Sequence, residues 1–437
     1  MAEYFHSVTL DTESCRGCIT CVKRCPTEAI RVRNGKAQIT KERCIDCGEC
    51  IRVCPHHAKH AVTDPLAAIK GFKYKVALPP PSLFGQYKNQ EDLELIRAGL
   101  LALGFDEVFE VAAAAELVSS ATRMMLERGK LKKPVISSAC PAVLRLIKIR
   151  FPNLLENVLP ISSPMEVAAK LAREQAVRNS GLRPEEIGIV FITPCPAKVT
   201  AIKNPFGIDK SDVDLAVSSA EVYPVLLSAM NKLAKNWKGD ADTAQTGRTG
   251  LSWGNSGGEA GATLATSYLA ADGIENVINV LEEMEDNKLA DQDFVELNAC
   301  PAGCVGGVLN VENPYVVVTR LKHLWAYLPV SCNNIKSGSI PKELLWTKDI
   351  KPLKTLSLSG DPFEAMRMMR KLEKIESKLY GLDCGSCGSP SCRALAEDIV
   401  RGYATEDLCI YLLKDKVDAV RSSMLSLKLE SREKGEG

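Results

Sequence analysis

The stretch Asn298-Ala299-Cys300-Pro301-Ala302-Gly303-Cys304-Val305-Gly306-Gly307 is the part of the chain on which the other motifs converge. It follows the β-prone run Phe294-Val295-Glu296-Leu297, and its two cysteines are spaced to share one face of a helical turn. A strand that delivers thiolates to a helix N-terminus makes a good soft-metal site, because the amides there stabilise negative charge. The glycines that follow let backbone approach a bulky ligand. We therefore expect a metal or cluster site, a buried structural pair being the alternative.

Length, composition and charge set the broad class of the protein. The chain has 437 residues, is 46% hydrophobic and carries a formal net charge of +1. We expect two to four domains and no binding to nucleic acid or to an anionic membrane. The start, Met1 to Leu10, lacks the pattern of a signal peptide, and no apolar run approaches about 18 residues, so the expected location is cytoplasmic. Seventeen cysteines in such a chain indicate metal rather than disulfides.

The N-terminal region, residues 1–68, carries two cysteine runs of identical spacing. Cys15-x2-Cys18-x2-Cys21-x3-Cys25-Pro26 recurs 29 residues later as Cys44-x2-Cys47-x2-Cys50-x3-Cys54-Pro55. This is the pattern of bacterial two-cluster ferredoxins, in which the fourth cysteine of each run ligates the other cluster. We expect an α+β ferredoxin-like domain with two [4Fe–4S] clusters, whose ligand sets are Cys15, Cys18, Cys21 and Cys54, and Cys25, Cys44, Cys47 and Cys50. Two zinc sites are the alternative, which leaves the Cys-Pro endings unexplained.

Residues 69–340 show alternating strand and helix signals. The expected helices are Glu91 to Leu103 and a long Ala-rich helix after Val111. The expected strands are Tyr74–Leu78, Glu107–Val111, Pro134–Cys140, Ile187–Cys195, Asn276–Leu281 and Phe294–Cys300. Strands separated by helices predict parallel sheets with helix-covered faces. We therefore expect an α/β body with parallel sheets.

Three of the expected strands end at a cysteine. These are Cys140, Cys195 and Cys300, and Cys304 follows one turn after the last. In such folds ligands bind outside the carboxyl ends of the strands, so four thiolates from distant segments can meet in one cleft. Structural zinc usually takes close cysteine pairs. A buried cluster is therefore the preferred interpretation, with zinc as the alternative.

Four segments carry a resemblance to a known family. They are Ser137-Ser138-Ala139-Cys140-Pro141, Thr193-Pro194-Cys195-Pro196-Ala197-Lys198, Trp253-Gly254-Asn255-Ser256-Gly257-Gly258-Glu259-Ala260, and the stretch from Asn298 to Gly307. The first, second and fourth resemble the three signature segments of the [FeFe] hydrogenases, and the third resembles a Gly-Gly loop of that family. The resemblance covers roughly Cys15 to Pro314, and the four cysteines in order make it specific for the superfamily.

The resemblance implies that the α/β body has two parallel-sheet lobes around a central cleft, with an H-cluster in that cleft. Its [4Fe–4S] cubane would be held by Cys140, Cys195, Cys300 and Cys304. Cys304 would also bridge to a diiron subsite carrying carbon monoxide and cyanide, and Lys198 would donate a hydrogen bond to a cyanide, since a compact ammonium suits an anionic ligand. An exposed lysine is the alternative. The residues implied to wrap the diiron subsite are Pro80, Pro81, Ser82, Ser138, Pro164, Trp253, Gly254, Gly257 and Gly258.

The chain departs from the family pattern along the proton path. Ala139 stands where active members carry the cysteine that passes a proton to the bridging amine of the diiron subsite. Ala201 replaces a glutamate and Leu159 replaces a serine of the relay, while Glu116 is its retained member. Three further changes near the diiron subsite replace a glutamine and two methionines: Met165, Thr193 and Asn298.

Loss of the proton-transfer group decides the expected activity. Such a group contributes about two to four decades of rate, and sensory members of the family likewise keep the cofactor and lack this cysteine. The resemblance implies slow, reversible H2 oxidation and proton reduction, used for H2 or redox sensing. The implied partners are H2 and protons, ferredoxin or another redox partner, and hydrogenase maturation proteins. The alternatives are a non-catalytic hydrogenase-like iron–sulfur assembly protein and an electron-transfer protein, each lacking the diiron subsite.

The C-terminal region carries a further cysteine group. The composition of residues 341–375 predicts a linker followed by the start of a helix. The linker is rich in Lys, Pro, Ser and Gly as far as Asp361, and the helix is expected from Pro362 to Tyr380. Residues 376–437 hold Cys384, Cys387, Cys392 and Cys409. A helix expected from Arg393 to Asp407 would bring Cys409 back to the other three cysteines. This pattern resembles a small α-helical [4Fe–4S] domain, a zinc site being the alternative, and brings the accessory clusters to three. Cys332 is left over and is expected to be buried.

The tail has apolar residues at alternating spacings of four and three. They are Leu413, Val417, Val420, Met424 and Leu427, a coiled-coil seam of about two heptads that is too short to stand alone in water. Packing of this seam onto its own domain is the preferred interpretation, and a homodimer or a partner helix is the alternative. The charged end from Ser431 to Gly437 is expected to fray.

Overall fold

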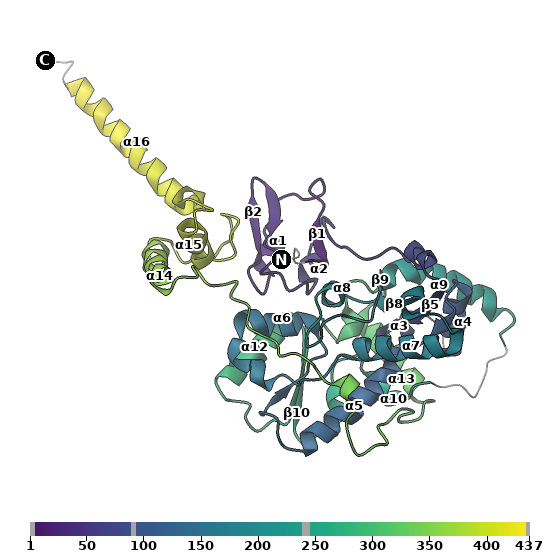
Figure 1. Ribbon diagram of the computed structural model, residues 1–437. Helices are drawn as coiled ribbons and strands as arrows, with labels where there is room; N and C mark the ends of the chain where they lie inside the picture. The colour runs from purple at the N-terminus through teal and green to yellow at the C-terminus, as the bar shows by residue number, and fades with distance from the viewer. Residues whose placement is uncertain (1–4, 89–92, 238–244, 434–437) are drawn as a thin grey trace. The chain divides into compact units, whose positions relative to one another are not determined.

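The computed structural model describes residues 5–88, 93–237 and 245–433, with side chains described as far as residue 426. The chain divides into two compact units (Figure 1). The first comprises Met1–Thr9, Ile45–Arg52 and His60–Leu353, and the second comprises Leu10–Cys44, Val53–Lys59 and Lys354–Gly437. The whole first cysteine run therefore shares a unit with the C-terminal cysteines, whereas the middle of the second run, Cys47 and Cys50, belongs with the α/β body.

A four-stranded parallel sheet forms one half of the α/β body, in the order β6-β5-β8-β9. Its strands are β5 Tyr74–Leu78, β6 Glu107–Val108, β8 Ile187–Thr193 and β9 Leu215–Ser218. All seven residues of β8 are buried, as expected for an apolar strand covered on both faces. The flanking helices are α5 Val111–Glu127 and α7 Pro164–Ser180 in one hydrophobic cluster, and α4 Leu93–Ala102 and α9 Ser219–Ala234 in another.

A three-stranded parallel sheet forms the other half, in the order β10-β11-β7. Its strands are β7 Val135–Ile136, β10 Tyr268–Asp272 and β11 Phe294–Asn298. Helices α6 Pro141–Arg150 and α12 Ile274–Glu285 pack in one hydrophobic cluster with residues of β7 and β11. The expected α/β body with parallel sheets is therefore confirmed.

One predicted strand is wrong. Residues Asn276–Leu281 lie inside helix α12, whose buried residues are Ile274, Val277, Leu281 and Met284. Their spacings of three and four are those of one helix face. The missing strand is β10, Tyr268–Asp272, which no sequence signal indicated because its side chains are half-buried or exposed. The expected helix start at Glu91 lies outside the described residues; the helix is described from Leu93.

Further helical elements complete the first unit. They are η1 Leu66–Gly71, α3 Pro81–Phe84, η2 Pro152–Asn157, η3 Pro184–Glu186, α8 Pro196–Lys203, α10 Arg248–Ser252, α11 Gly258–Thr263, η4 Cys304–Gly306, α13 Pro314–Trp325 and η5 Lys342–Leu344. The first part of the expected linker packs on the body. Leu344 is 4% exposed, and the backbone N–H of Thr347 donates to Gly207 O at 2.8 Å.

The second unit holds a β-hairpin and a small helical module. Strands β2 Ile30–Arg33 and β3 Lys36–Ile39 are antiparallel, and the helices are α1 Thr20–Lys23, α14 Pro362–Glu376, α15 Cys392–Val400, η6 Glu406–Leu408 and α16 Ile410–Glu433. Helix α15 ends at Val400, earlier than the predicted Asp407, because Gly402 adopts a positive φ of 80°. Strands β1 Val8–Leu10 and β4 Lys59–Ala61 pair separately, and α2 spans Glu49–Arg52.

Helix α16 is the C-terminal helix (Figure 1), and four residues of its expected apolar seam are exposed. Leu413, Val417, Val420 and Met424 are each more than two-fifths exposed. The expected packing of this seam onto its own domain is therefore wrong for these four residues, because no described element covers them. The side chain of Leu427 and residues 434–437 of the tail lie outside the described part. No helix among the described residues is long and apolar enough to cross a membrane.

Candidate functional site

Three cysteines are positioned by the carboxyl ends of parallel strands. Cys140 and Cys195 are the N-cap residues of helices α6 and α8, and each is followed by a proline at the first helical position. Proline suits that position because its missing N–H has no helical partner there. Cys300 follows β11 directly. The backbone therefore places these three thiols at the sheet edges, as expected.

The segment between Cys300 and Cys304 is a turn and not the helical turn that its spacing suggested. Ala302 and Gly303 have positive φ values of 61° and 89°. A Cβ on Gly303 would lie 2.5 Å from Ser256 N, so the turn is pressed against the Gly-Gly loop. Cys304 then opens the short 3-10 helix η4. The correction has a physical reason, since a glycine before the second cysteine permits a conformation that breaks the helix.

The four thiols lie within range of one another's charge. Desolvation raises the pKa of Cys195 to about 12; Lys198 opposes this shift, and Cys304 and Cys140 add to it. Desolvation also raises the pKa of Cys300 and of Cys304, again with contributions from neighbouring cysteines. Four thiolates in such a place require compensating positive charge, which a metal cluster supplies. The donor set therefore fits an iron–sulfur cluster.

A cavity beside Cys304 is lined from both sheets of the body. Its walls are formed by Pro80, Pro81, Val111, Ala115, Ala139, Pro164, Met165, Phe191, Pro194, Lys198, Trp253, Gly254, Glu259, Glu296, Asn298 and Cys304. Five of the nine residues expected to wrap a diiron subsite are in this lining: Pro80, Pro81, Pro164, Trp253 and Gly254. The other four, Ser82, Ser138, Gly257 and Gly258, lie next to lining residues in the sequence.

Two polar groups test whether this cavity fits an anionic diiron unit. Lys198 lines the cavity, and its ammonium makes no hydrogen bond to any residue in the described part of the chain. The charges of Cys304, Cys195, Cys140 and Cys300 raise its pKa, although desolvation, the largest single effect, lowers it. The buried hydroxyl of Ser82 also has no hydrogen-bond partner among the described residues. A cation and a hydroxyl without partners fit a polar, negatively charged group.

Two buried carboxylates in the cavity wall were missed by sequence reasoning. Ser137 Oγ donates to Glu259 Oε2 at 2.6 Å, and burial together with the neighbouring Glu296 raises the pKa of Glu259 to about 8. Glu296 accepts hydrogen bonds from Gly257 N at 3.0 Å, Ala260 N at 2.7 Å and Asn298 Nδ2 at 2.7 Å. Glu259 therefore holds a proton at neutral pH. A glutamate inside the apolar run of β11 was the signal that could have found Glu296.

A second cavity meets the first one at Ala139. Ala139, Met165 and Lys198 line both cavities, and the second is also lined by Glu166, Ser138 and Ala201. Burial raises the pKa of Glu166 to about 7, although the hydroxyl of Ser211 donates to its carboxylate. Ala139 stands at the position that the resemblance assigns to a proton donor. It thus lines two cavities that each contain a carboxyl group with a raised pKa, Glu259 in the first and Glu166 in the second.

Glu116 has a structural role in this fold. Its carboxylate accepts hydrogen bonds from Gly247 N at 2.8 Å, Cys332 N at 3.0 Å, Asn333 N at 2.8 Å and Asn333 Nδ2 at 2.8 Å. It is absent from the lining of both cavities among the described residues. The expectation that Cys332 is buried is wrong, because its side chain is exposed. Glu116 thereby holds the loop that carries Cys332, and its part in a proton path stays a prediction.

The middle of the second ferredoxin-like run packs on the central site. Arg52 donates to Gly306 O at 2.7 Å, and Thr200 Oγ1 donates to Asp46 Oδ2 at 2.8 Å. Cys47 packs against the same hydrophobic cluster as Cys140 and Cys195. The segment Ile45–Arg52, which carries Cys47 and Cys50, is thereby tied to the loops that hold the four central thiols.

Two further cysteine groups form within the second unit. The charge of Cys21 interacts with those of Cys18, Cys54 and Cys15, so Cys54 of the second run joins three cysteines of the first. Cys384, Cys387, Cys392 and Cys409 line a single cavity. In that cavity Cys392 N donates to Asp383 Oδ1 at 2.6 Å. Both groups have four sulfur donors, as a [4Fe–4S] cluster requires.

Three family models match the chain. The model described as "Iron only hydrogenase large subunit, C-terminal domain" matches residues 74–271 and 261–308, which together span 235 of the 437 residues. A "4Fe-4S dicluster domain" model matches residues 7–55, and a model for an Fe–S cluster matches residues 379–411. These matches fall on the regions whose cysteines the structure gathers.

Similar proteins include hydrogenases and an assembly factor. The NADP-reducing hydrogenase subunit HndD of Solidesulfovibrio fructosivorans is 25% identical, with 48% of this chain and 44% of that protein covered. The periplasmic [Fe] hydrogenase large subunit of Nitratidesulfovibrio vulgaris is 26% identical, with 69% and 86% covered. The cytosolic Fe-S cluster assembly factor NAR1 of Yarrowia lipolytica is 23% identical, with 33% and 30% covered. The chain thus spans less than half the length of HndD and of NAR1.

A solved structure has the same fold over much of the chain. A variant of apo [FeFe]-hydrogenase HydA1 from Chlamydomonas reinhardtii matches with a TM-score of 0.50 and 18% sequence identity, covering 64% of this chain and 94% of that one. At this identity the likeness concerns the fold alone.

Proposed function

Because the chain belongs to the iron-only hydrogenase large-subunit family, we propose that it is a hydrogenase-type iron–sulfur protein that slowly interconverts H2 with protons and electrons and serves as a sensor of H2 or of redox state. The observation that carries the proposal is the cavity beside Cys304. There an ammonium without a hydrogen-bond partner faces a set of four thiols.

The cofactor of this proposal is an H-cluster in the central cavity, beside three accessory [4Fe–4S] clusters. Cys140, Cys195, Cys300 and Cys304 would hold its cubane, and Cys304 would bridge to the diiron subsite. When bound, the diiron subsite supplies the redox and Lewis-acid chemistry of H2. Lys198 would donate to an anionic ligand of that subsite, and the loops of Pro80–Ser82 and Gly254–Gly258 would keep water from it.

The groups in the cavity that can hold a proton support the slow turnover that we propose. Ala139 has no group that can hold a proton, so the short donor path of active relatives is missing. Glu259 holds a proton at its carboxyl group in the cavity wall, and Ser137 links it to the backbone N–H of Ala139 at 3.1 Å. We infer that Glu259 is the residue that supplies protons here. A positioned carboxyl group with a pKa near the working pH is suited to this role.

Electrons would enter and leave through the accessory clusters. The contacts of Arg52 with Gly306 and of Asp46 with Thr200 support a position of Cys47 and Cys50, two expected cluster ligands, beside the central site. Ferredoxin or another redox protein in the cytoplasm would exchange these electrons, and hydrogenase maturation proteins would insert the diiron subsite. Both partners belong to the proposal.

A second candidate function is that of a non-catalytic assembly or electron-transfer protein without the diiron subsite. The similarity to the assembly factor NAR1 and the lack of a titratable group at position 139 favour it. In that case Lys198 and the four central cysteines would serve a cubane alone.

Infrared spectroscopy distinguishes the two functions. Protein prepared with hydrogenase maturation proteins should show bands of iron-bound carbon monoxide and cyanide and should evolve H2 from a strong reductant. Its iron content should be about 18 per chain, from four cubanes and two diiron atoms. Full cubane iron without diatomic bands, or without any H2 reaction at full loading, would reject the hydrogenase proposal.

Cys304→Ala is the matched control for that measurement. If Cys304 bridges the two parts of the cofactor, this variant should lose the diatomic bands and the H2 reaction together, while the accessory clusters keep their iron. Unchanged bands in Cys304→Ala would place the bridge at another residue.

A further inference from the structure

The C-terminal cysteine loop is paired with the ferredoxin-like hairpin inside the second unit. Val32 N, in β2, donates to Gly388 O at 2.8 Å. Gly388 has a φ of +79°, and a Cβ at this position would lie 2.1 Å from Val32 O. The backbone at Gly388 follows Cys387 directly, so the pairing fixes a cluster-binding turn against β2. Only glycine allows this approach.

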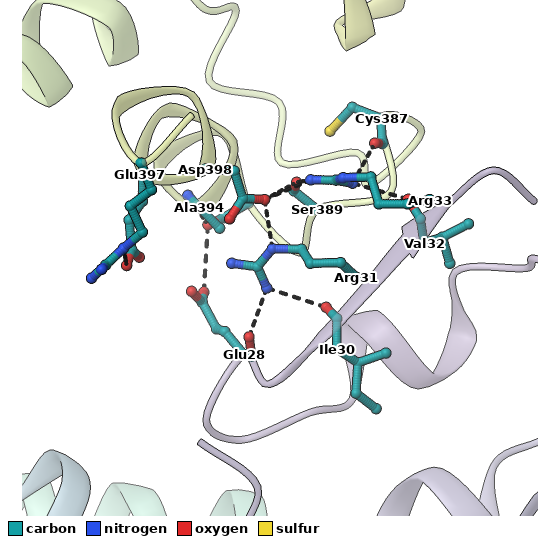
Figure 2. A network of polar contacts seen from close by, with 12 residues as sticks. Glu28, Ile30, Arg31, Val32, Arg33, Cys387, Ser389, Ala394, Glu397 and Asp398 are labelled. Atoms are coloured by element: carbon teal, nitrogen blue, oxygen red, sulfur yellow. Dashed lines mark hydrogen bonds and ion pairs between the residues drawn. The ribbon is translucent and has the colours of Figure 1, made fainter. Parts of the chain in front are cut away.

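A buried ion-pair network locks the same contact (Figure 2). Asp398 Oδ2 accepts from Arg31 Nε at 2.7 Å, from Arg33 Nη2 at 2.6 Å and from Ser389 Oγ at 3.0 Å. The three charged side chains are 8% to 15% exposed. Removing one partner of a buried network leaves the others uncompensated, which is strongly unfavourable. Asp398 on α15 therefore binds the helical module to the two arginines of β2.

A second carboxylate on α15 strengthens the lock. Glu397 pairs with Arg43 and, at 2.8 Å, with Arg401. Although burial alone would raise the pKa of Glu397, these two guanidinium groups hold it below its ordinary value. Glu397 and Asp398, which are neighbours on α15, thus contact arginines at both ends of the segment from β2 to Cys44.

Cations lie directly between the loops of the two cysteine groups. Lys23, two residues after Cys21, donates from Nζ to Asp383 O at 2.6 Å and to Pro390 O at 3.0 Å. Arg33 Nη1 donates to Cys387 O at 3.1 Å. A Cβ at Gly385, between Cys384 and Cys387, would lie 3.3 Å from Lys23 Cδ. The hydrogen bonds of Lys23 therefore tie the C-terminal cysteine segment to the helix that carries Cys21.

From this geometry we propose that the C-terminal cluster exchanges electrons directly with the first ferredoxin-type cluster, and that Asp398 with Arg31 and Arg33 is the docking lock that holds the pair in contact. The proposal rests on the cluster content of the proposed function. The step moves one electron: the first cluster goes from its 1+ to its 2+ state as the C-terminal cluster goes from 2+ to 1+. No proton or further reactant takes part.

Lys23 and Arg33 also favour one direction of this electron transfer. Reduction adds a negative charge to the C-terminal cluster, and Lys23 and Arg33 stand beside its binding loop. Net charge and hydrogen bonds near a cluster tune its reduction potential. Because Lys23 Nζ donates to carbonyls of the C-terminal segment and its charge acts on Cys384, it favours the reduced form of the C-terminal cluster over that of the first cluster.

Electron paramagnetic resonance of the full chain tests the docking lock. Fully reduced wild type should show spin–spin coupling of the C-terminal cluster to the first ferredoxin-type cluster, apart from any coupling between the two ferredoxin-type clusters, and this coupling should be absent when the C-terminal cluster is oxidised. Asp398→Asn keeps the side-chain volume and removes the charge that the two arginines share. It should abolish the coupling and slow reduction of the C-terminal cluster at least tenfold. Asp407→Asn removes an exposed ion pair with Lys416 on the same module and should leave both properties unchanged.

Lys23→Met tests the bias without disturbing the buried lock, since Lys23 is exposed. It should lower the equilibrium constant for reducing the C-terminal cluster about tenfold, which is 59 mV for a one-electron couple. Iron and zinc are measured in every sample. Zinc at the C-terminal cysteines would refute the proposed cluster content and the junction together. A full set of clusters without coupling in wild type, or coupling and reduction rate kept in Asp398→Asn, would refute the junction alone.

Discussion

The hydroxyl of Ser137 donates a 2.6 Å hydrogen bond to the carboxyl group of Glu259, and it accepts one at 3.1 Å from the backbone N–H of Ala139. Glu259 comes from the Gly-Gly loop and Ser137 from the first cysteine segment. This bond joins a proton-holding group to the turn that lacks the usual donor. The cavity therefore has a titratable group, Glu259, at a position other than 139.

Glu259→Gln should lower H2 evolution by about one to two decades, because the amide cannot pass on a proton and a positioned acid contributes about two to four decades. The measurement is H2 evolution with a strong reductant at equal cofactor loading, judged by the diatomic infrared bands. Glu110→Gln is the matched control. Burial also raises the pKa of Glu110, which is hydrogen-bonded to Thr246 at 2.6 Å but does not line the cavity among the described residues. Equal losses in the two variants would contradict a special role for Glu259.

Glu166 should make the stability of the protein depend on pH. Burial raises its pKa from 4.5 to about 7, so the folded state favours the protonated form. That contribution is fully present below about pH 4.5 and is lost as the pH rises through about 7. At about 1.4 kcal/mol per pKa unit, the loss is about 3 kcal/mol.

The check is the urea midpoint at pH 5 and pH 8. The midpoint of wild type should fall between these values more than that of Glu166→Gln, whose side chain does not titrate. Glu174→Gln changes an exposed residue of the same helix and should behave as wild type does. A wild-type midpoint that stays constant or rises, with Glu166→Gln changing in parallel, would contradict the raised pKa.

The sequence was most informative where covalent spacing decides the outcome. The strand of Ile187–Thr193 followed by Cys195 was predictable, because a continuous apolar run before a cysteine and a proline has one common structure in an α/β protein. Residues Asn276–Leu281 were misassigned because a short apolar run fits either a strand or a helix face. The structure resolves this through Ile274 and Met284, which extend the helical spacing on both sides.

The acidic part of the site was not predictable by the same reasoning. Nothing in the local sequence of Glu259 reveals that Ser137, 122 residues away, contacts it. Glu116 was included through resemblance alone, and its four hydrogen bonds come from residues 131 or more positions away. Long-range contacts of this kind depend on how the two sheets pack, which local propensity does not specify.

Gly258→Ala should destabilise the protein by about 1–3 kcal/mol, as expected for overpacking. An ideal Cβ at this position would lie 1.9 Å from Ser252 O, and backbone atoms cannot move away as a flexible side chain can. Gly261→Ala is the matched control in the same helix. Its Cβ would meet nothing nearer than Tyr268 Oη at 3.9 Å, so it should stabilise by about 0.5–1 kcal/mol. Urea unfolding compares the two, and similar midpoints would contradict the close packing of the Gly-Gly loop.

Ala139→Cys tests whether the missing donor limits turnover. Ala139 lines both cavities, so a thiol there would face the expected position of the diiron subsite. The added sulfur is small, and strain should be modest. If proton transfer limits the rate, H2 evolution should rise by about one decade or more.

Resupply of that thiol decides how large the gain can be. Glu116 is held by four hydrogen bonds, and Leu159 and Ala201 offer no proton, so the path of active relatives is broken beyond position 139. Glu259 and Glu166 are carboxyl groups with raised pKa values in the walls of the two cavities that Ala139 lines. Ala139→Cys combined with Glu259→Gln should therefore lose most of the gain if Glu259 resupplies the thiol. All variants are compared at equal diatomic band intensity. No gain in Ala139→Cys, and none after Leu159→Ser and Ala201→Glu are added, would falsify proton transfer as the limiting step. The slow turnover that we propose would then be assigned to electron delivery through the proposed accessory clusters.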